Sequence, residues 1–216
     1  MIGMLFRRTP AGKWVSLCVA LFLIIDLLPV SATAAAAPEE VVQSFYGTLL
    51  STMRQGPVLG QSGRYARLAP VVDRTFDIPR MTRLALGSAW GTLDPAQQRM
   101  ITSAFARYVS ATYADRFETY SGEQLQVSGE RPYGADLIVA TKIVKTNGEV
   151  TKLDYLMHQD QGSWRISDVY LDGTISQLAV HRAEFYSILR REGVDGLVTA
   201  LNHKVDLLRS VARSES

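Results

Sequence analysis

The chain has 216 residues, of which 23 are lysine or arginine and 21 are aspartate or glutamate, so its formal net charge is only +2. A charge this small excludes the strongly basic surface of a typical nucleic-acid-binding protein. The hydrophobic share of 47% and the charged share of 20% indicate a folded protein rather than a disordered one. The single cysteine, Cys18, excludes an internal disulfide framework and a cysteine-based zinc site.

Residues 1–37 have the pattern of a cleaved secretory signal peptide. Three basic residues precede an apolar segment at 14–28, and small residues suited to signal peptidase follow it. The apolar segment is shorter than the about 20 residues that span a bilayer, so we expect cleavage rather than a retained anchor. Residues 38–216 would then form one exported domain with 20 basic and 20 acidic residues and no cysteine.

Three helices are predicted in the first part of this domain. Apolar residues at helical spacing begin after Pro38, with acidic residues in the first turn, and Gly56 followed by proline ends the pattern. The shorter segments 63–72 and 79–88 also have helical character.

The longest helix is predicted to begin at Pro95. Asp94 is a suitable N-cap and proline fits the first turn of a helix, while the pattern continues to about Tyr120. One face of this helix is apolar and strongly aromatic. Its residues are Ile101, Phe105, Tyr108, Val109, Thr112, Tyr113 and Phe117.

The second half of the domain changes to the two-residue alternation of β-strands. Four antiparallel strands are predicted over 125–127, 137–143, 151–157 and 164–171. Asn147-Gly148 indicates a two-residue hairpin turn, and a change of phase at Ser167-Asp168 predicts a β-bulge or a bend. Two helices separated at Gly193 close the chain.

This order of helices, sheet and helices predicts an α+β fold, with a four-stranded curved antiparallel sheet packed against several helices. The aromatic and apolar faces of these elements converge, which fits either a solid core or an apolar cavity between sheet and helices. The residues expected to line such a cavity are Phe105, Tyr108, Val109, Tyr113, Phe117, Val139, Tyr155, Met157, Trp164 and Phe185.

Motifs for catalysis or metal binding are lacking in the sequence. His158, His181 and His203 are far apart, and neither a nucleophile elbow nor a phosphate-binding glycine loop occurs, so we expect no metal and no cofactor. Arg182 interrupts an apolar helical stripe. Because a buried unpaired guanidinium is costly, we expect that the stem of Arg182 packs while its head reaches water at the rim of the cavity, or that it forms a buried ion pair with Asp168 or Asp172. An acid–base role for Asp168 or His158 is the enzymatic alternative.

Five segments carry a family resemblance by their order and spacing: Phe76–Trp90, Leu93–Arg99, Gly162–Val169, Asp172–Ser176 and Arg182–Phe185. Together they resemble the MlaC (toluene-tolerance) family of periplasmic phospholipid-binding proteins, which are auxiliary components of ABC lipid transport. The amino-acid sequence of residues 170–176 is most similar to that of the hopanoid-associated HpnM branch.

The resemblance implies a monomeric periplasmic carrier rather than an enzyme. Such a protein binds the apolar part of a phospholipid or hopanoid in an internal cavity, because each methylene costs about 0.8 kcal/mol to leave in water. It exchanges the lipid with an inner-membrane transporter and an outer-membrane lipoprotein or porin complex. Two alternatives are a chaperone-like or structural periplasmic module with a solid core, and an isomerase or hydrolase on a cone-shaped sheet.

Overall fold

The computed structural model describes residues 36–214, so nearly all of the predicted signal peptide lies outside the described residues. The helices are α1 (Pro38–Arg54), α2 (Gly56–Thr75), α3 (Ile78–Leu86), the short 3₁₀ helix η1 (Gly87–Thr92), α4 (Pro95–Arg116) and α5 (Gln177–Ser214). The strands are β1 (Gln124–Tyr133), β2 (Asp136–Val144), β3 (Val150–Asp160), β4 (Ser163–Leu171) and β5 (Ile175–Ser176).

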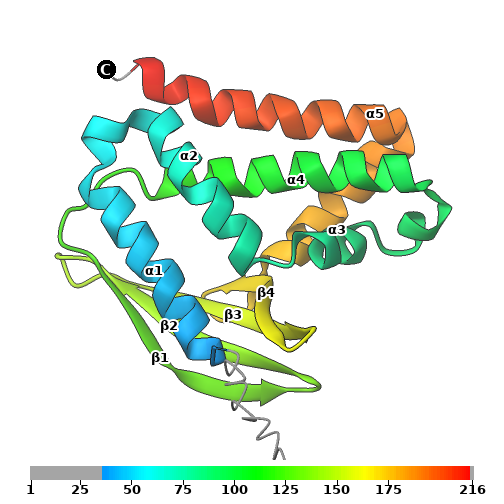
Figure 1. Ribbon diagram of the computed structural model, residues 1–216. Coiled ribbons are helices and arrows are strands. Elements are labelled where there is room, and N and C mark those ends of the chain that lie inside the picture. The colour runs from blue at the N-terminus through cyan, green and yellow to red at the C-terminus, as the bar shows by residue number, and fades with distance from the viewer. Residues whose placement is uncertain (1–35, 215–216) are drawn as a thin grey trace, which may run out of the picture. The chain divides into compact units, whose positions relative to one another are not determined.

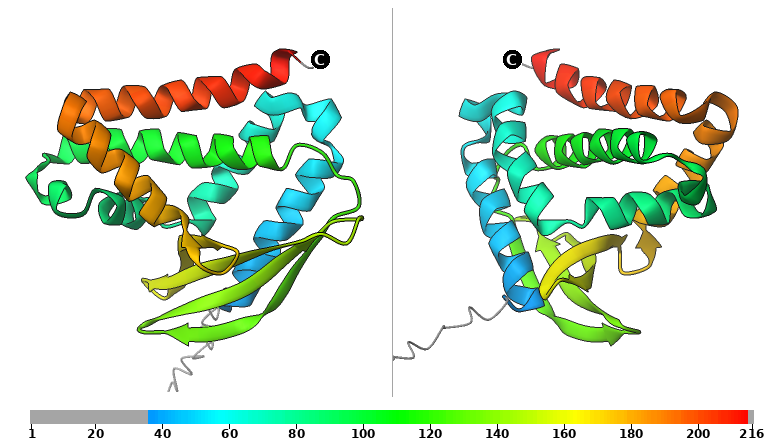
Figure 2. Two further views of the ribbon diagram at one scale, coloured as in Figure 1. Left: turned by 180° about the vertical axis from the view of Figure 1, so that it is seen from behind. Right: turned by 45° about the vertical axis from the view of Figure 1, so that its right-hand side comes forward.

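The strands form one curved sheet in the order β1-β2-β3-β4-β5, with every neighbouring pair antiparallel (Figure 1). The helices cover one face of this sheet (Figure 2). The second half of α5 packs along α4 on the side of α4 that faces away from the sheet. The α+β prediction is therefore confirmed. The sheet has a short fifth strand that was not expected, because a turn at Asp172 and Gly173, both with positive φ, folds the chain back onto β4.

The N-terminal helices differ from the prediction in where they begin and end. The expected segment 63–72 lies within α2, which already starts at Gly56 and changes direction at Gly60 (φ 58°, ψ −179°). Pro57 lies in the first turn of α2, where its missing N–H costs no hydrogen bond. Asp77 caps α3 by accepting a hydrogen bond from the Arg80 N–H at 3.0 Å.

The predicted start of α4 is confirmed. The Asp94 carboxylate accepts hydrogen bonds from the backbone N–H groups of Ala96 and Gln97, at 2.7 and 2.9 Å. The helix ends at Arg116, about one turn before the predicted end. The predicted break in α5 is also confirmed, because Gly193 (φ 69°, ψ −166°) separates its two helical segments.

The strand pairing confirms the predicted bulge in β4. Leu156 pairs with Asp168 and Met157 with Ile166, so Ser167 is the extra residue. The hairpin between β2 and β3 turns near Asn147-Gly148 as predicted, but its loop spans residues 145–149. A hydrogen bond from the Lys145 N–H to the Glu149 carbonyl closes this loop, which makes it longer than a two-residue turn.

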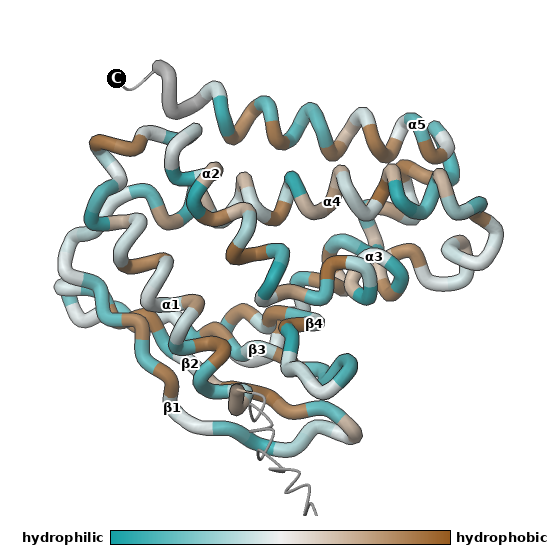
Figure 3. Tube along the Cα trace, in the orientation of Figure 1, coloured by the Kyte–Doolittle hydropathy of each residue, from teal (hydrophilic) through white to brown (hydrophobic). Residues whose placement is uncertain are grey.

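The hydrophobic core lies between the helices and the sheet. Hydrophobic and hydrophilic residues alternate along α4, α5 and the strands (Figure 3). Phe45 of α1 joins these layers, because its ring packs edge-on against Phe76 at 5.4 Å and against Tyr113 of α4 at 5.1 Å. Over residues 36–214, no helix has the length and apolar character needed to cross a membrane.

Candidate functional site

A cavity of about 560 Å³ opens between α4 and the sheet. Residues of α4, of strands β1–β4 and of the start of α5 form most of its wall, and α1 and α3 contribute Met53 and Met81. The cavity therefore lies between the long helix α4 and the face of the sheet that the helices cover.

The inner wall of the cavity is apolar. Val109, Tyr113 and Phe117 follow each other at four-residue spacing and point from α4 and its C-cap towards the sheet. Odd-numbered strand residues face them from the other side, because alternate residues of a strand share one face. These residues are Leu125, Ile143, Thr151, Leu153, Val169 and Leu171.

Charged residues gather at one edge of the cavity. Arg116, Glu118, Glu123 and Lys145 come from the C-terminal end of α4 and from the adjoining ends of β1 and β2. Lys145 forms an ion pair with Glu149 at 3.0 Å. This edge thus offers charges of both signs beside an apolar interior.

His181 of α5 forms another part of the cavity wall, where its ring packs against aromatic side chains. Its ring packs against Phe105 at 5.3 Å and against Tyr108 at 5.7 Å. Burial lowers the pKa of His181 below its ordinary value of 6.5, which favours the neutral imidazole at neutral pH.

Four of the ten predicted cavity residues line this cavity: Tyr108, Val109, Tyr113 and Phe117. The other six lie elsewhere in or near the core. Phe105 and Phe185 pack edge-on against each other at 5.3 Å and join α4 to α5.

The predicted strand residues lie beside the cavity rather than on its wall. Tyr155 is covered by α1, with its ring centre 5.9 Å from that of Tyr46. Val139, which pairs with Tyr155, and Met157 are fully buried in the same core, and Trp164 is partly buried at the start of β4. Their part in binding stays a prediction.

Of the two alternatives for Arg182, the ion pair with Asp168 does not form. Arg182 is exposed, and its guanidinium lies over Gly87, with Nη2 only 3.3 Å from where a Cβ would be. Asp168 is buried and accepts hydrogen bonds from the Leu178 N–H at 3.0 Å and from the Ser176 hydroxyl at 2.5 Å. Its carboxylate holds the first turn of α5, so it needs no guanidinium partner.

The histidine and aspartate considered for acid–base chemistry do not face the cavity. His158 lies on the opposite face of the sheet from Tyr155, where its Nδ1 is 2.7 Å from Asp136. His203 is exposed on α5. Within residues 36–214, no group of three histidine, cysteine or acidic residues could hold a metal ion.

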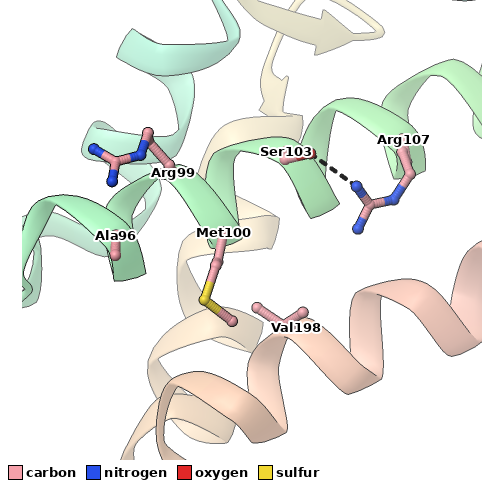
Figure 4. A pocket seen from close by; sticks show the side chains of 6 residues that line it. All are labelled: Ala96, Arg99, Met100, Ser103, Arg107 and Val198. Atoms are coloured by element: carbon pink, nitrogen blue, oxygen red, sulfur yellow. Dashed lines mark hydrogen bonds between the residues drawn. The ribbon is translucent and has the colours of Figure 1, made fainter.

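A second hollow, of about 500 Å³, lies on the surface between α4 and the second half of α5 (Figure 4). Met100 and Val198 form its apolar part, and Arg107 donates hydrogen bonds to Ser103 and to Asn202 beside it, each at 2.8 Å. This hollow is open to solvent and holds none of the predicted site residues, so the cavity beneath α4 is the stronger candidate.

Known proteins share this fold. The family model described as "MlaC protein" matches residues 43–203. The toluene tolerance protein ttg2D of Pseudomonas putida is 24% identical over 183 residues, which cover 81% of this chain and 83% of that protein. A solved structure of the phospholipid-binding protein from Ralstonia solanacearum, in complex with a phospholipid, matches with a TM-score of 0.68 and 24% identity, covering 80% of this chain and 99% of that chain.

Proposed function

The chain belongs to the MlaC family, and from this premise we propose that it is a lipid carrier that holds the apolar part of a phospholipid between α4 and the sheet. The structural relative from Ralstonia solanacearum, a phospholipid-binding protein in complex with its ligand, supports the proposal.

The cavity beneath α4 is the observation that carries this function. Its volume of about 560 Å³ falls within the range of about 300–1,000 Å³ that is usual for ligand pockets. Its inner wall is built from aromatic and aliphatic side chains, which provide an environment similar to the interior of a bilayer. Each methylene that enters would save about 0.8 kcal/mol relative to water.

The charged edge of the cavity suits a lipid headgroup. Arg116 and Lys145 provide cations and Glu118 and Glu123 provide anions, and all four border the apolar wall. A headgroup with separated positive and negative charges would find partners of both signs there. We therefore place the acyl chains inside and the headgroup at this edge.

The wider role of the carrier follows from the same proposal. With the signal peptide predicted at residues 1–37, the mature protein would act in the periplasm and exchange lipid with an inner-membrane transporter and an outer-membrane lipoprotein or porin complex. A hopanoid is the alternative cargo. Neither Asp168 nor His158 lines the cavity, which favours a carrier over an isomerase or hydrolase.

Native mass spectrometry tests the proposal. The full chain, expressed with its own export signal, is purified from the periplasm, and bound lipid is extracted and identified. We expect one lipid for each protein molecule, and at least a tenfold loss of bound lipid in Val109→Trp, because the indole would fill the cavity beside Tyr113. Val58→Trp is the matched control, since Val58 is 92% exposed on α2.

The opposite results would contradict the carrier. A wild-type protein that carries no lipid, and that also extracts none from phospholipid vesicles, would favour a structural module. Equal loading of Val109→Trp and Val58→Trp would place the lipid outside this cavity.

A further inference from the structure

Four hydroxyl groups from four different elements converge beside the cavity. They belong to Tyr46 of α1, Tyr113 of α4, Thr141 of β2 and Tyr155 of β3, and we call them the hydroxyl cluster. Tyr113 is the member that lines the cavity. The cluster therefore links the cavity wall to polar groups within the core.

The inner hydrogen bonds of the cluster have a defined direction. The Thr141 hydroxyl donates its single proton to the Leu153 carbonyl. In the 2.5 Å contact between Tyr46 and Thr141, the Thr141 oxygen must therefore accept, and Tyr46 donates. The proton of Tyr46 is thus not available to a ligand.

The Tyr155 hydroxyl is the buried member of the cluster that lacks a hydrogen-bond partner among the described residues. Tyr155 is fully buried, and its hydroxyl completes no hydrogen bond with the residues that the structure describes. The hydroxyls of Tyr46 and Tyr113 are close enough to act on its pKa, without completing a bond. Buried hydroxyls normally have a partner, so this group needs an explanation.

We infer that the hydroxyl cluster is a hydrogen-bonding subsite that receives, through Tyr113, an ester carbonyl oxygen of the bound lipid. The inference rests on the proposed function and adds one contact to it, namely the group that would recognise an ester carbonyl of the phospholipid. Tyr113 donates its proton to the carbonyl, and its own oxygen then accepts the proton of Tyr155. Both hydroxyls gain partners in this arrangement.

The chemistry of the lipid matches this chain of donors. An ester carbonyl only accepts hydrogen bonds, and the carbonyls mark the junction between headgroup and acyl chains. Tyr113 lies about one helical turn before Arg116 of the charged edge. If the headgroup binds at this edge, the ester carbonyls next to it would lie at the level of Tyr113. Burial raises the pKa of both Tyr113 and Tyr155, so both keep their protons at physiological pH.

A pair of lipids that differ only in the carbonyl tests this subsite. The full chain is delipidated and titrated with diacyl phosphatidylcholine and with the dialkyl ether analogue of equal chain length. We expect the wild type to bind the ester lipid about 2- to 10-fold more tightly, the range that one hydrogen bond supplies. Tyr113→Phe should remove this preference, and Tyr155→Phe should reduce it.

Tyr186→Phe is the control, because Tyr186 is 56% exposed on α5 and lies outside both the cavity and the cluster. It should keep the full ester preference. Circular dichroism and thermal unfolding establish that each variant folds, and Tyr155→Phe is expected to fold because it removes a hydroxyl that has no partner.

The outcomes separate this inference from the proposed function. Equal affinity of the wild type for ester and ether lipids, or an unchanged preference in Tyr113→Phe, would overturn the subsite while leaving the carrier intact. Failure of the wild type to bind either lipid would overturn both.

Discussion

At the scale of single residues, Asp168 illustrates how burial and hydrogen bonding oppose each other. Burial raises the pKa of its carboxyl above the ordinary value of 3.8, while hydrogen bonds from Ser176, Leu178 and Val169 oppose this rise. Since the pKa of Asp168 is higher in the folded than in the unfolded chain, the stability that this carboxyl contributes is fully present at pH values below its unfolded-state pKa. This stability is lost as the pH rises through its folded-state pKa.

Asp168→Asn tests this pH dependence. The neutral amide can accept the backbone hydrogen bonds of Val169 and Leu178 through its oxygen and can donate to Ser176. The difference in unfolding free energy, wild type minus variant, should therefore decrease as the pH rises between the two pKa values and stay constant above them. Urea unfolding from about pH 3 to about pH 7 measures it, and a difference that increases with pH would contradict the prediction.

Asp168 also shows what a sequence does not reveal about single residues. Arg182 interrupts an apolar helical stripe, and this pattern predicts an ion pair with a carboxylate such as Asp168 as one alternative, because a buried charge needs a partner. The partners of Asp168 are instead the N–H groups and the hydroxyl at the start of α5. Backbone donors leave no pattern in the side chains, so this solution could not be predicted.

At the scale of elements, two glycines set the directions of α2 and α5. Gly60 and Gly193 have φ of 58° and 69° with ψ near 180°, a conformation that is essentially restricted to glycine. Gly193→Ala should lower the free energy of unfolding by about 1–3 kcal/mol from backbone strain alone, because the added Cβ would meet no atom within 4 Å. Urea denaturation measures this loss.

Gly47→Ala is the control for backbone strain. Gly47 lies within α1, where an added Cβ also meets nothing within 4 Å, so alanine should stabilise the helix by about 0.5–1 kcal/mol. The two substitutions are chemically identical and should change stability in opposite directions. A gain of stability in Gly193→Ala similar to that in Gly47→Ala would show that the conformation at Gly193 carries no strain.

Elements with local signals could be predicted from the sequence, and the others could not. Asp94 capped α4 as expected, and the bulge at Ser167 followed from a change of phase within one strand. The start of α2 was missed, because Gly56 followed by proline is equally compatible with the end of one helix and the first turn of the next.

At the scale of the whole molecule, the arrangement of α1 over the sheet decides which residues reach the cavity. Leu153 and Tyr155 lie on the same face of β3 and have the same alternation in the sequence. Leu153 lines the cavity, whereas Tyr155 is covered by α1 beneath Tyr46. The sequence therefore indicates the face of the sheet that borders the cavity but not the part of that face that α1 leaves uncovered.

Lipid binding in the proposed cavity would be coupled to the stability of the whole protein. A ligand present at 100 times its dissociation constant stabilises the folded state by about 2.7 kcal/mol. For a protein of this size, that corresponds to a rise in Tm of roughly 5–10 °C. We predict a rise of this magnitude when delipidated wild type is loaded with phospholipid and measured by scanning calorimetry.

The indole of Val109→Trp should abolish this rise, while Val58→Trp should keep it. A ligand raises Tm only by binding the folded state more tightly than the unfolded one. The difference between these two variants therefore locates the stabilising lipid. If the rise persisted in Val109→Trp, the lipid would bind outside the cavity beneath α4, and the apolar wall around Val109 would serve the fold rather than the cargo.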